Sequence, residues 1–236
     1  MTKIALITGA NKGIGYEIAR LLAEQGVTAI VGARDEERGR AAAERLGLPY
    51  VRIDVTDEDS AAAAAKWIEQ KFGTLDILVN NAGIAGDLSQ VQPSAASARA
   101  LRDVYETNVF GVVTVTNAML PLLRTSPAGR IVNMSSELGS LTMAADPASP
   151  FADATFLAYN SSKSALNMIT VLYARELKDT PIKVNAANPG YCATDLNGHS
   201  GFRTAEQGAA IAVRLATLDE NGPTASYQQE AGVVPW

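Results

Sequence analysis

The sequence predicts a single α/β domain built on an open, doubly wound parallel sheet. Short β-branched runs alternate along the chain with segments of helical apolar period. Right-handed crossovers between such strands place helices on both faces of one sheet. A length of 236 residues fits one domain, without a linker. We therefore expect about seven strands with helices on both faces.

The first half of the chain alternates strands and helices without interruption. A β-branched run opens it, and a glycine-rich turn then leads into the first helix. The third helix has Asp57 or Thr56 as its cap. The expected strands are 3–8, 27–32, 50–54 and 75–79, and the expected helices are 13–25, 36–46 and 57–72.

The second half repeats this unit. A long amphipathic stretch at about 97–123 precedes a strand at 130–134, and a helix at about 157–177 precedes a strand at 182–186. A last helix is expected at 204–216. The segment 139–155 is long and irregular, as functional loops at strand ends often are. Ligands of such sheets bind beyond the carboxyl ends of the strands, so the residues after each strand should form the site.

Composition excludes several classes of function. The formal net charge is −5, so no basic surface for nucleic acid is expected. No apolar signal segment follows Met1 and no apolar run has membrane-spanning length, which predicts a cytoplasmic protein with no membrane partner. A lone Cys192 excludes an intrachain disulfide, and a lone His199 removes most metal sites, so we expect no metal.

A glycine-rich turn follows the first strand and runs directly into a helix. Residues 8–15 read Thr-Gly-Ala-Asn-Lys-Gly-Ile-Gly. Glycines let the backbone approach a pyrophosphate, and the helix N-terminus presents unpaired N–H groups to it. The spacing differs from the commoner Gly-x-Gly-x-x-Gly fingerprint, and an ordinary structural turn is the alternative. The turn favours a dinucleotide site.

The end of the second strand indicates which dinucleotide is bound. An NAD site usually offers a carboxylate there, but the strand ends at Arg34 and Asp35 follows it. Lys12 of the glycine-rich turn is a second cation that can lie near the adenosine ribose. Two cations suit a 2′-phosphate and favour NADP over NAD, whereas the alternative is that both are solvated surface charges.

A tyrosine and a lysine lie about one helical turn apart at the start of the 157–177 helix. Tyr159 and Lys163 share a helix face, so the ammonium can lie beneath the phenol and favour its ionised form. In most proteins such a pair is simply a packed helix face. Beside a nucleotide loop, the pair implies a proton donor and a redox cofactor in one site.

Together these motifs resemble the short-chain dehydrogenase/reductase family, most of all its carbonyl-reductase-like members, over almost the whole chain. Residues 8–15 match the cofactor loop of that family and Asn80-Asn81-Ala82-Gly83 its element after the fourth strand. The other matches are Asn108 in the central helix, Ser136 after the fifth strand, the Tyr159/Lys163 helix, and Pro189-Gly190 with Thr194. The resemblance implies one NAD(P)-binding Rossmann domain over 1–236, with substrate loops at about 139–156 and 190–203.

The resemblance also implies a role for each catalytic residue. Tyr159 would act as general acid or base. Lys163 and the positively charged nicotinamide would lower its pKa, and Lys163 would also bind the nicotinamide ribose. Ser136 would contact the substrate oxygen and Asn108 would hold a water that leads to Lys163. Ser135 is the nearest competitor for the serine role, but successive strand residues face opposite sides.

The implied cofactor contacts extend from the glycine turn to the segment that covers the nicotinamide. Asp54 contacts adenine or, alternatively, caps a helix. Asn80 is expected to brace the fourth strand, and residues 81–83 to line the adenosine ribose. The full set is Gly9, Asn11, Lys12, Gly13, Ile14, Gly15, Arg34, Asp54, Val55, Asn81, Ala82, Gly83, Tyr159, Lys163, Pro189, Gly190 and Thr194.

The loops bear on substrate and assembly. Residues from about 140 to 154 lengthen the interval between Ser136 and Tyr159, and either shape the substrate mouth or block a helix-helix dimer face, so a monomer or homodimer is expected. Cys192 and His199 fall in the covering segment. Cys192 is expected to be a packing residue and His199 a surface residue, and the alternative is a chemical role. Trp236 is either a terminal anchor or a pocket wall. An apolar carbonyl substrate is favoured by Leu141, Met143, Phe151, Phe156, Leu196 and Phe202.

The leading hypothesis is an NADPH-dependent reductase of ketones or aldehydes. The reverse reaction, the oxidation of an alcohol, uses the same groups. The alternative is an NADP-binding redox-sensing or regulatory protein without turnover, but such proteins typically lose the tyrosine and lysine. A serine hydrolase would need a Gly-x-Ser-x-Gly elbow and a placed histidine, and only His199 is present.

Overall fold

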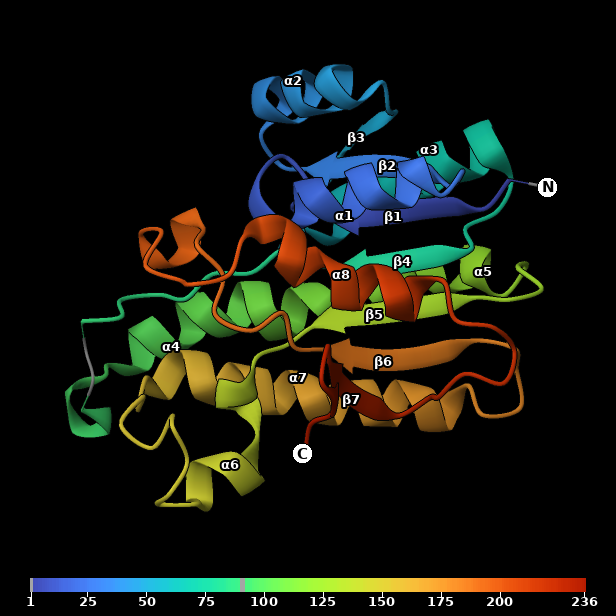
Figure 1. Ribbon diagram of the computed structural model, residues 1–236. Helices are drawn as coiled ribbons and strands as arrows, with labels where there is room; N and C mark the ends of the chain where they lie inside the picture. Colours follow the sequence, from blue (N-terminus) through green and yellow to red (C-terminus); the bar gives the residue numbers. More distant parts are fainter. Residues whose placement is uncertain (1, 90–91) are drawn as a thin grey trace.

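The protein forms one eight-stranded sheet with helices on both faces (Figure 1). The computed structural model describes residues 2–89 and 92–236. The strands lie in the order β3-β2-β1-β4-β5-β6-β7-β8, and only the β7–β8 pair is antiparallel. Their bounds are β1 (Ile4–Thr8), β2 (Thr28–Ala33), β3 (Tyr50–Arg52), β4 (Ile77–Asn80), β5 (Arg130–Met134), β6 (Lys183–Ala187), β7 (Ser226–Gln229) and β8 (Gly232–Val233).

The doubly wound parallel sheet predicted from the sequence is confirmed, and its order reverses between β1 and β4. The connections from these two neighbouring strands run to opposite faces of the sheet. This leaves a crevice at the carboxyl ends of the strands, where ligands of such sheets bind. The six strands whose positions were predicted are all present, as β1 to β6. β7 and β8 were not located from the sequence, because SYQQ and GV carry no apolar β-branched run.

Alternation along the strands builds a core on each face of the sheet. Ile4 and Leu6 point to one face, and Ala5 and Ile7 point to the other. The second face is covered by α1 (Gly13–Glu24), α2 (Glu36–Leu46) and α8 (Ala205–Ala216). The first is covered by α3 (Glu58–Phe72), α5 (Gly111–Leu123) and α7 (Leu157–Glu176). Both faces are therefore closed, and the carboxyl ends of the strands are left for a site.

The long helix predicted at 97–123 is not one regular α-helix. It consists of α4 (Ala98–Tyr105), a π-helical segment (Glu106–Phe110) and α5. π-Helical turns occur mainly as short interruptions of α-helices, often at functional sites. Asn108 lies in the middle of this one. The amphipathic period of the sequence could not reveal it, because one wide turn barely changes the apolar pattern.

The segment predicted to be irregular contains a short helix. A 3₁₀ turn (Glu137–Gly139) and α6 (Leu141–Ala145) precede α7, and in Figure 1 α6 lies below α7, close to the C-terminal end of the chain. The Thr142 N–H and hydroxyl both donate to the Trp236 carbonyl, at 3.1 and 2.8 Å. The Trp236 ring stacks on Tyr227 of β7 at 5.5 Å. These contacts give Trp236 the anchoring role.

Candidate active site

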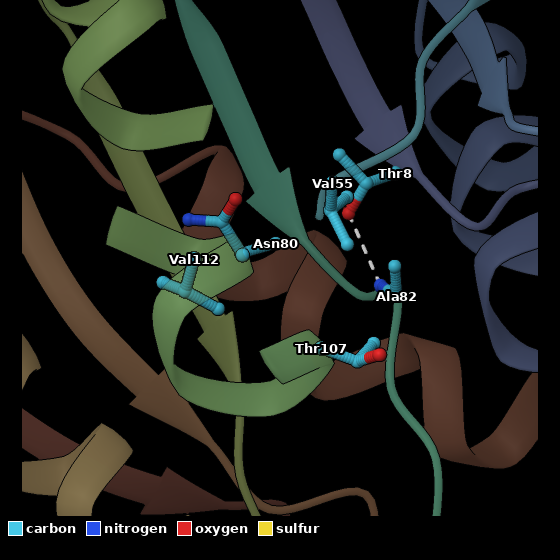
Figure 2. Close-up of a pocket in the computed structure, with 7 residues that line it drawn as sticks. Thr8, Val55, Asn80, Ala82, Thr107 and Val112 are labelled. Atoms are coloured by element: carbon cyan, nitrogen blue, oxygen red, sulfur yellow. Dashed lines mark hydrogen bonds between the residues drawn. The ribbon is translucent and has the colours of Figure 1, made fainter. Parts of the chain in front are cut away.

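The predicted site residues lie at the carboxyl end of the sheet, on the loops that follow β1 to β6, on the π-helical segment and on α7. A hydrogen-bonded brace joins the first two loops: the Thr8 hydroxyl accepts from the Asn81 N–H at 3.0 Å and from the Ala82 N–H at 3.1 Å. Figure 2 shows the Thr8–Ala82 bond, with Val55 beside Thr8 and Thr107 facing Ala82. The Asn81 side chain donates to the Thr8 and Gly9 carbonyls at 2.9 and 3.3 Å. Asn81, predicted to line the ribose, thus holds the glycine turn with its side chain.

Asn80 makes the bracing contacts that its position predicts. Its amide donates to Thr116 on α5 at 3.0 Å and to Asn133 on β5 at 2.9 Å. All three side chains are buried. This polar network fixes the end of β4 against its neighbours, because a buried amide that found no partner would cost free energy.

The glycine turn has the shape of a dinucleotide cradle. Gly9 and Gly13 have φ of 65° and 57°, a region that side-chain-bearing residues rarely adopt. A Cβ on Gly15 would lie 2.6 Å from the Gly9 carbonyl oxygen and would collide with the Asn81 amide. Lys12, the N-cap of α1, makes no side-chain hydrogen bond to the helix. Backbone and helix N-terminus therefore present a close, positively polarised surface that fits a pyrophosphate, with Asn11 and Ile14 within the turn.

The end of β2 offers no free carboxylate. Asp35 caps α2 by accepting from the Arg38 N–H at 3.0 Å, and the Arg38 guanidinium lies 3.5 Å from its other oxygen. Arg34 is exposed, and no ion pair involves it among the described residues. The Asp35 carboxylate is thus engaged by α2, whereas the Arg34 side chain is exposed.

Lys12 is held by the segment that covers the site, the lid of residues 190–203. Its ammonium lies 2.5 Å from Asp195, whose other oxygen is 2.8 Å from His199 Nε2. The pKa of Asp195 is lowered, first by the Lys12 hydrogen bond and then by His199. Thr194 lies over Gly13, where an added Cβ would contact its methyl group at 3.7 Å. The Lys12 side chain thus ties the lid to the glycine turn, a contact that the sequence did not predict.

Cys192 and His199 behave as packing and surface residues. Cys192 is buried, its thiol donates to the Pro189 carbonyl at 3.3 Å, and burial raises its pKa. His199 is exposed. Neither side chain has the surroundings of a reactive group.

The structure corrects the alternative role given to Asp54. It caps no helix, because Asp57 caps α3 by accepting from Asp59 and Ser60. The Asp54 carboxylate instead accepts from the Thr56 N–H and hydroxyl at 3.0 and 2.8 Å. Val55 lies beside it on the wall of the hollow in Figure 2.

Tyr159 and Lys163 lie on one face of α7, next to the carboxyl end of β5. The Lys163 ammonium is 5.6 Å from the Tyr159 ring centroid and donates to the Met134 carbonyl at 2.8 Å. Lys163 is only 6% exposed. Gly83 lies close by, since a Cβ there would be 3.7 Å from the lysine nitrogen and 3.3 Å from the Asn108 side-chain oxygen. The pair therefore faces the loop that follows β4.

In the chain without a cofactor, burial dominates the pKa of the phenol, and its lowering by Lys163 together with the nicotinamide stays a prediction. Burial raises the pKa of Tyr159 to about 12, against a lowering by the Ser136 hydroxyl and a further raising by the Glu137 charge. Burial also lowers the pKa of Lys163 to about 8. The lysine nitrogen is engaged by a backbone carbonyl and lies beneath the ring. Near neutral pH the phenol is thus protonated, as a proton donor must be.

Asn108 uses its whole side chain to hold the loop after β4. Its oxygen accepts from the Ile84 N–H at 2.9 Å, and its amide donates to the Ile84 carbonyl at 2.8 Å and to Ser162 at 3.1 Å. It is 1% exposed. These contacts give Asn108 a bracing role, and its side-chain oxygen keeps one acceptor position beside the Ile84 N–H, so the water that the resemblance implied stays a prediction.

The two serines after β5 have different surroundings. The Ser135 hydroxyl is buried and donates to Asn167 at 2.6 Å. Ser136 is half-buried and its hydroxyl accepts from the Leu138 N–H at 3.3 Å, while it also interacts with the Tyr159 phenol. Ser136 is thus the serine beside the phenol.

Two residues near the phenol were not singled out from the sequence. Glu137 follows Ser136 directly, and its carboxylate accepts from the Asn188 amide at 2.5 Å. Tyr227 on β7 is fully buried, and burial raises its pKa. A charged residue next to the candidate serine was a visible signal for Glu137. Tyr227 gave none, because its strand was not recognised.

The lowered pKa of Lys163 predicts a rise of stability with pH. Between about pH 8 and its ordinary value of 10.5, the unfolded chain binds a proton that the folded chain does not. The free energy of unfolding should rise by roughly 2 kcal/mol from pH 8 to 10, and Lys163→Met should remove that rise. Urea unfolding at several pH values measures it, with exposed Lys66→Met as control. Equal slopes in the wild type and Lys163→Met would contradict a buried, titrating lysine.

No helix of the described residues is long and apolar enough to cross a membrane. Within residues 2–89 and 92–236, no group of three or more His, Cys, Asp or Glu side chains could hold a metal ion.

Comparisons with known proteins agree on one family. The family model described as short chain dehydrogenase matches residues 3–204. A short-chain dehydrogenase of Penicillium roqueforti is 42% identical over 225 residues, which cover 91% of this chain and 88% of that protein. Carbonyl reductase 1 (NADPH) of Bos taurus is 32% identical over 276 residues, which cover 99% and 98%. The structure of salutaridine reductase from Papaver somniferum is similar with a TM-score of 0.83 and 29% identity, covering 95% and 99%.

Proposed function

Since the chain belongs to the short-chain dehydrogenase/reductase family, whose members are oxidoreductases of carbonyl and alcohol groups, we propose that it is an NADPH-dependent reductase of ketones and aldehydes. One observation carries the proposal. A protonated phenol, a serine hydroxyl and a buried amine, from Tyr159, Ser136 and Lys163, meet beside a glycine cradle. NADPH, when bound, supplies a hydride to the carbonyl carbon.

The residues that would hold the dinucleotide come from five segments. The glycine turn and the N-terminus of α1 would take the pyrophosphate, and Arg34 with Lys12 the 2′-phosphate. Asp54 and Val55 would lie along the adenine, and residues 81–83 along its ribose. Pro189, Gly190 and Thr194 would cover the nicotinamide, with Lys163 at its ribose. Lys12 would exchange Asp195 for the phosphate, because both are anions that compete for one ammonium.

The chain's own groups then handle the substrate oxygen and its proton. The Ser136 hydroxyl donates a hydrogen bond to the substrate oxygen and stabilises the charge that develops on it. Tyr159 gives its proton to that oxygen. Its raised pKa keeps the phenol protonated near neutral pH, which is the form that can donate to the substrate oxygen. Lys163, protonated below about pH 8, holds positive charge beneath the ring.

The substrate class follows from the mouth of the site. Large apolar side chains stand exposed on α6 and the lid: Leu141 is 70% exposed, Leu196 42% and Phe202 84%. Covering these side chains with an apolar molecule would remove their surface from water, which is favourable. The Bos taurus relative bears the name carbonyl reductase. We therefore assign a small, largely apolar carbonyl compound as the substrate.

Arg34→Asp tests the cofactor choice. The variant should weaken NADPH binding about tenfold or more while NADH binding changes about twofold or less, because a charged hydrogen bond to the 2′-phosphate contributes about 1.5–3 kcal/mol. Dissociation constants of both dinucleotides, measured by calorimetry, give the ratio. Arg99→Asp on α4, also exposed, makes the same charge change elsewhere. An equal loss for both dinucleotides would reject the phosphate contact.

A further inference from the structure

One carboxylate at the carboxyl end of the sheet, next to the candidate serine, is not used by the proposed reaction. Glu137 directly follows Ser136 and starts the 3₁₀ turn after β5. The Asn188 amide at the end of β6 donates to it at 2.5 Å, and the same amide donates to Gln229 at 3.0 Å. Asn188 is 2% exposed, and its oxygen accepts from the Gly190 N–H at 3.1 Å. The carboxylate is therefore held at the base of the lid, above the ends of β5 and β6.

The charge of Glu137 acts on ionisable groups of three other elements. Its negative charge raises the pKa of Tyr159 on α7, of Tyr227 on β7 and of Cys192 in the lid. These groups come from three separate elements around the site. The direct contact with Asn188 places it independently of these effects.

In the part of the chain that the structure describes, no cation pairs with Glu137. Among the described residues no ion pair involves Glu137, whereas the nearby cations are taken: Arg203 binds Glu230, and Lys163 donates to a backbone carbonyl. Taking a carboxylate partly out of water costs free energy unless it is paired. A bound molecule that brings a positive charge would offset this cost, and one that brings a negative charge would add to it.

We propose that Glu137 is a specificity-determining residue that selects carbonyl substrates carrying a protonated amine and rejects those carrying a carboxylate. The proposal rests on the proposed reductase function and narrows its substrate to an apolar carbonyl compound with one basic nitrogen. The apolar side chains of the mouth contact the skeleton, and Glu137 contacts the ammonium. Ser136 and Tyr159 remain with the carbonyl oxygen.

The test uses three aryl ketones with one skeleton, bearing an aminomethyl group, a methyl group or a carboxylate. We expect the kcat/KM of the wild type to be about tenfold higher for the amine than for the neutral ketone. For the carboxylate it should be about tenfold lower than for the neutral ketone. Each tenfold ratio corresponds to about 1.4 kcal/mol. In Glu137→Gln both ratios should fall to within about twofold, with the neutral ketone reduced within about threefold of wild type. Glutamine keeps an oxygen for the Asn188 amide, so the loop is retained.

Glu69→Gln on the exposed face of α3 removes the same charge far from the site and should leave all ratios unchanged. Inhibition of neutral-ketone reduction by the corresponding alkylamine without a carbonyl supplies a second readout, which should weaken about tenfold in Glu137→Gln. Reduction of the neutral ketone without a charge preference, or a preference that survives Glu137→Gln, overturns the role of Glu137 and leaves the reductase function intact. If the wild type reduces none of the three ketones, the proposed function and this inference both fail.

Discussion

Replacing Tyr159 with phenylalanine is expected to lower kcat about a thousandfold or more, because general acid catalysis contributes about 10²–10⁴-fold and Ser136 cannot supply the proton in its place. The change removes one oxygen and keeps the ring over Lys163. NADPH affinity should therefore stay within a few-fold of wild type. Steady-state rates with NADPH and a reactive ketone give kcat, and calorimetry gives the dissociation constant.

Tyr173→Phe is the matched control. Tyr173 lies on the same helix, and its hydroxyl donates to Asn117 at 2.7 Å, away from the site. This variant should turn over at the wild-type rate. If Tyr159→Phe keeps full activity, Tyr159 is not the acid. If the wild type binds NADPH tightly but reduces no carbonyl, the regulatory alternative gains support.

Gly15→Ala is expected to weaken NADPH binding about a hundredfold and to lower the free energy of unfolding by about 1–3 kcal/mol, the usual cost of overpacking a well-packed interior. The added methyl would lie 2.6 Å from the Gly9 carbonyl oxygen and would collide with the Asn81 amide. Either the glycine turn or the loop after β4 has to move. Both movements open the brace through which Asn81 holds the cradle.

Gly47→Ala separates the two effects. Gly47 ends α2 with φ of 66°, and nothing lies within 4 Å of an added Cβ. It should lower stability by about 1–2 kcal/mol through backbone strain alone and leave NADPH affinity unchanged. Calorimetric binding and urea unfolding of both variants make the comparison. Normal NADPH affinity in Gly15→Ala would mean that the dinucleotide does not use this cradle.

The sequence was sufficient for the sheet and for naming the side chains that the structure brings to its carboxyl end. Strands buried on both faces carry continuous apolar runs, and such runs, alternating with helical segments, located β1 to β6. The order of Thr8, the glycines and α1 predicted the cradle, because a glycine turn between a strand and a helix places the helix N-terminus at the carboxyl end of the sheet. Tyr159 and Lys163 could be paired because helix geometry places residues four apart on one face.

The remaining features depend on contacts between distant segments. The brace from Asn81 to Thr8 and Gly9, and the contact of Lys12 with Asp195, join parts of the chain that spacing does not relate. The raised pKa of Tyr159 needed the burial of the site and the position of Glu137. Sequence reasoning assigned the pKa of the phenol to the lysine and the nicotinamide, and could not include the burial that dominates it in the chain without a cofactor. β7, and with it Tyr227, lacked an apolar alternating pattern.

The most direct test of the account follows a deuterium atom from NADPH labelled at both C4 positions of the nicotinamide. We predict that the wild type produces alcohol with deuterium on the former carbonyl carbon, read by mass spectrometry, and that Tyr159→Phe with NADPH bound produces almost none. Alcohol without deuterium, or labelled alcohol formed equally fast by both proteins, would contradict a hydride transfer completed by the proton of Tyr159.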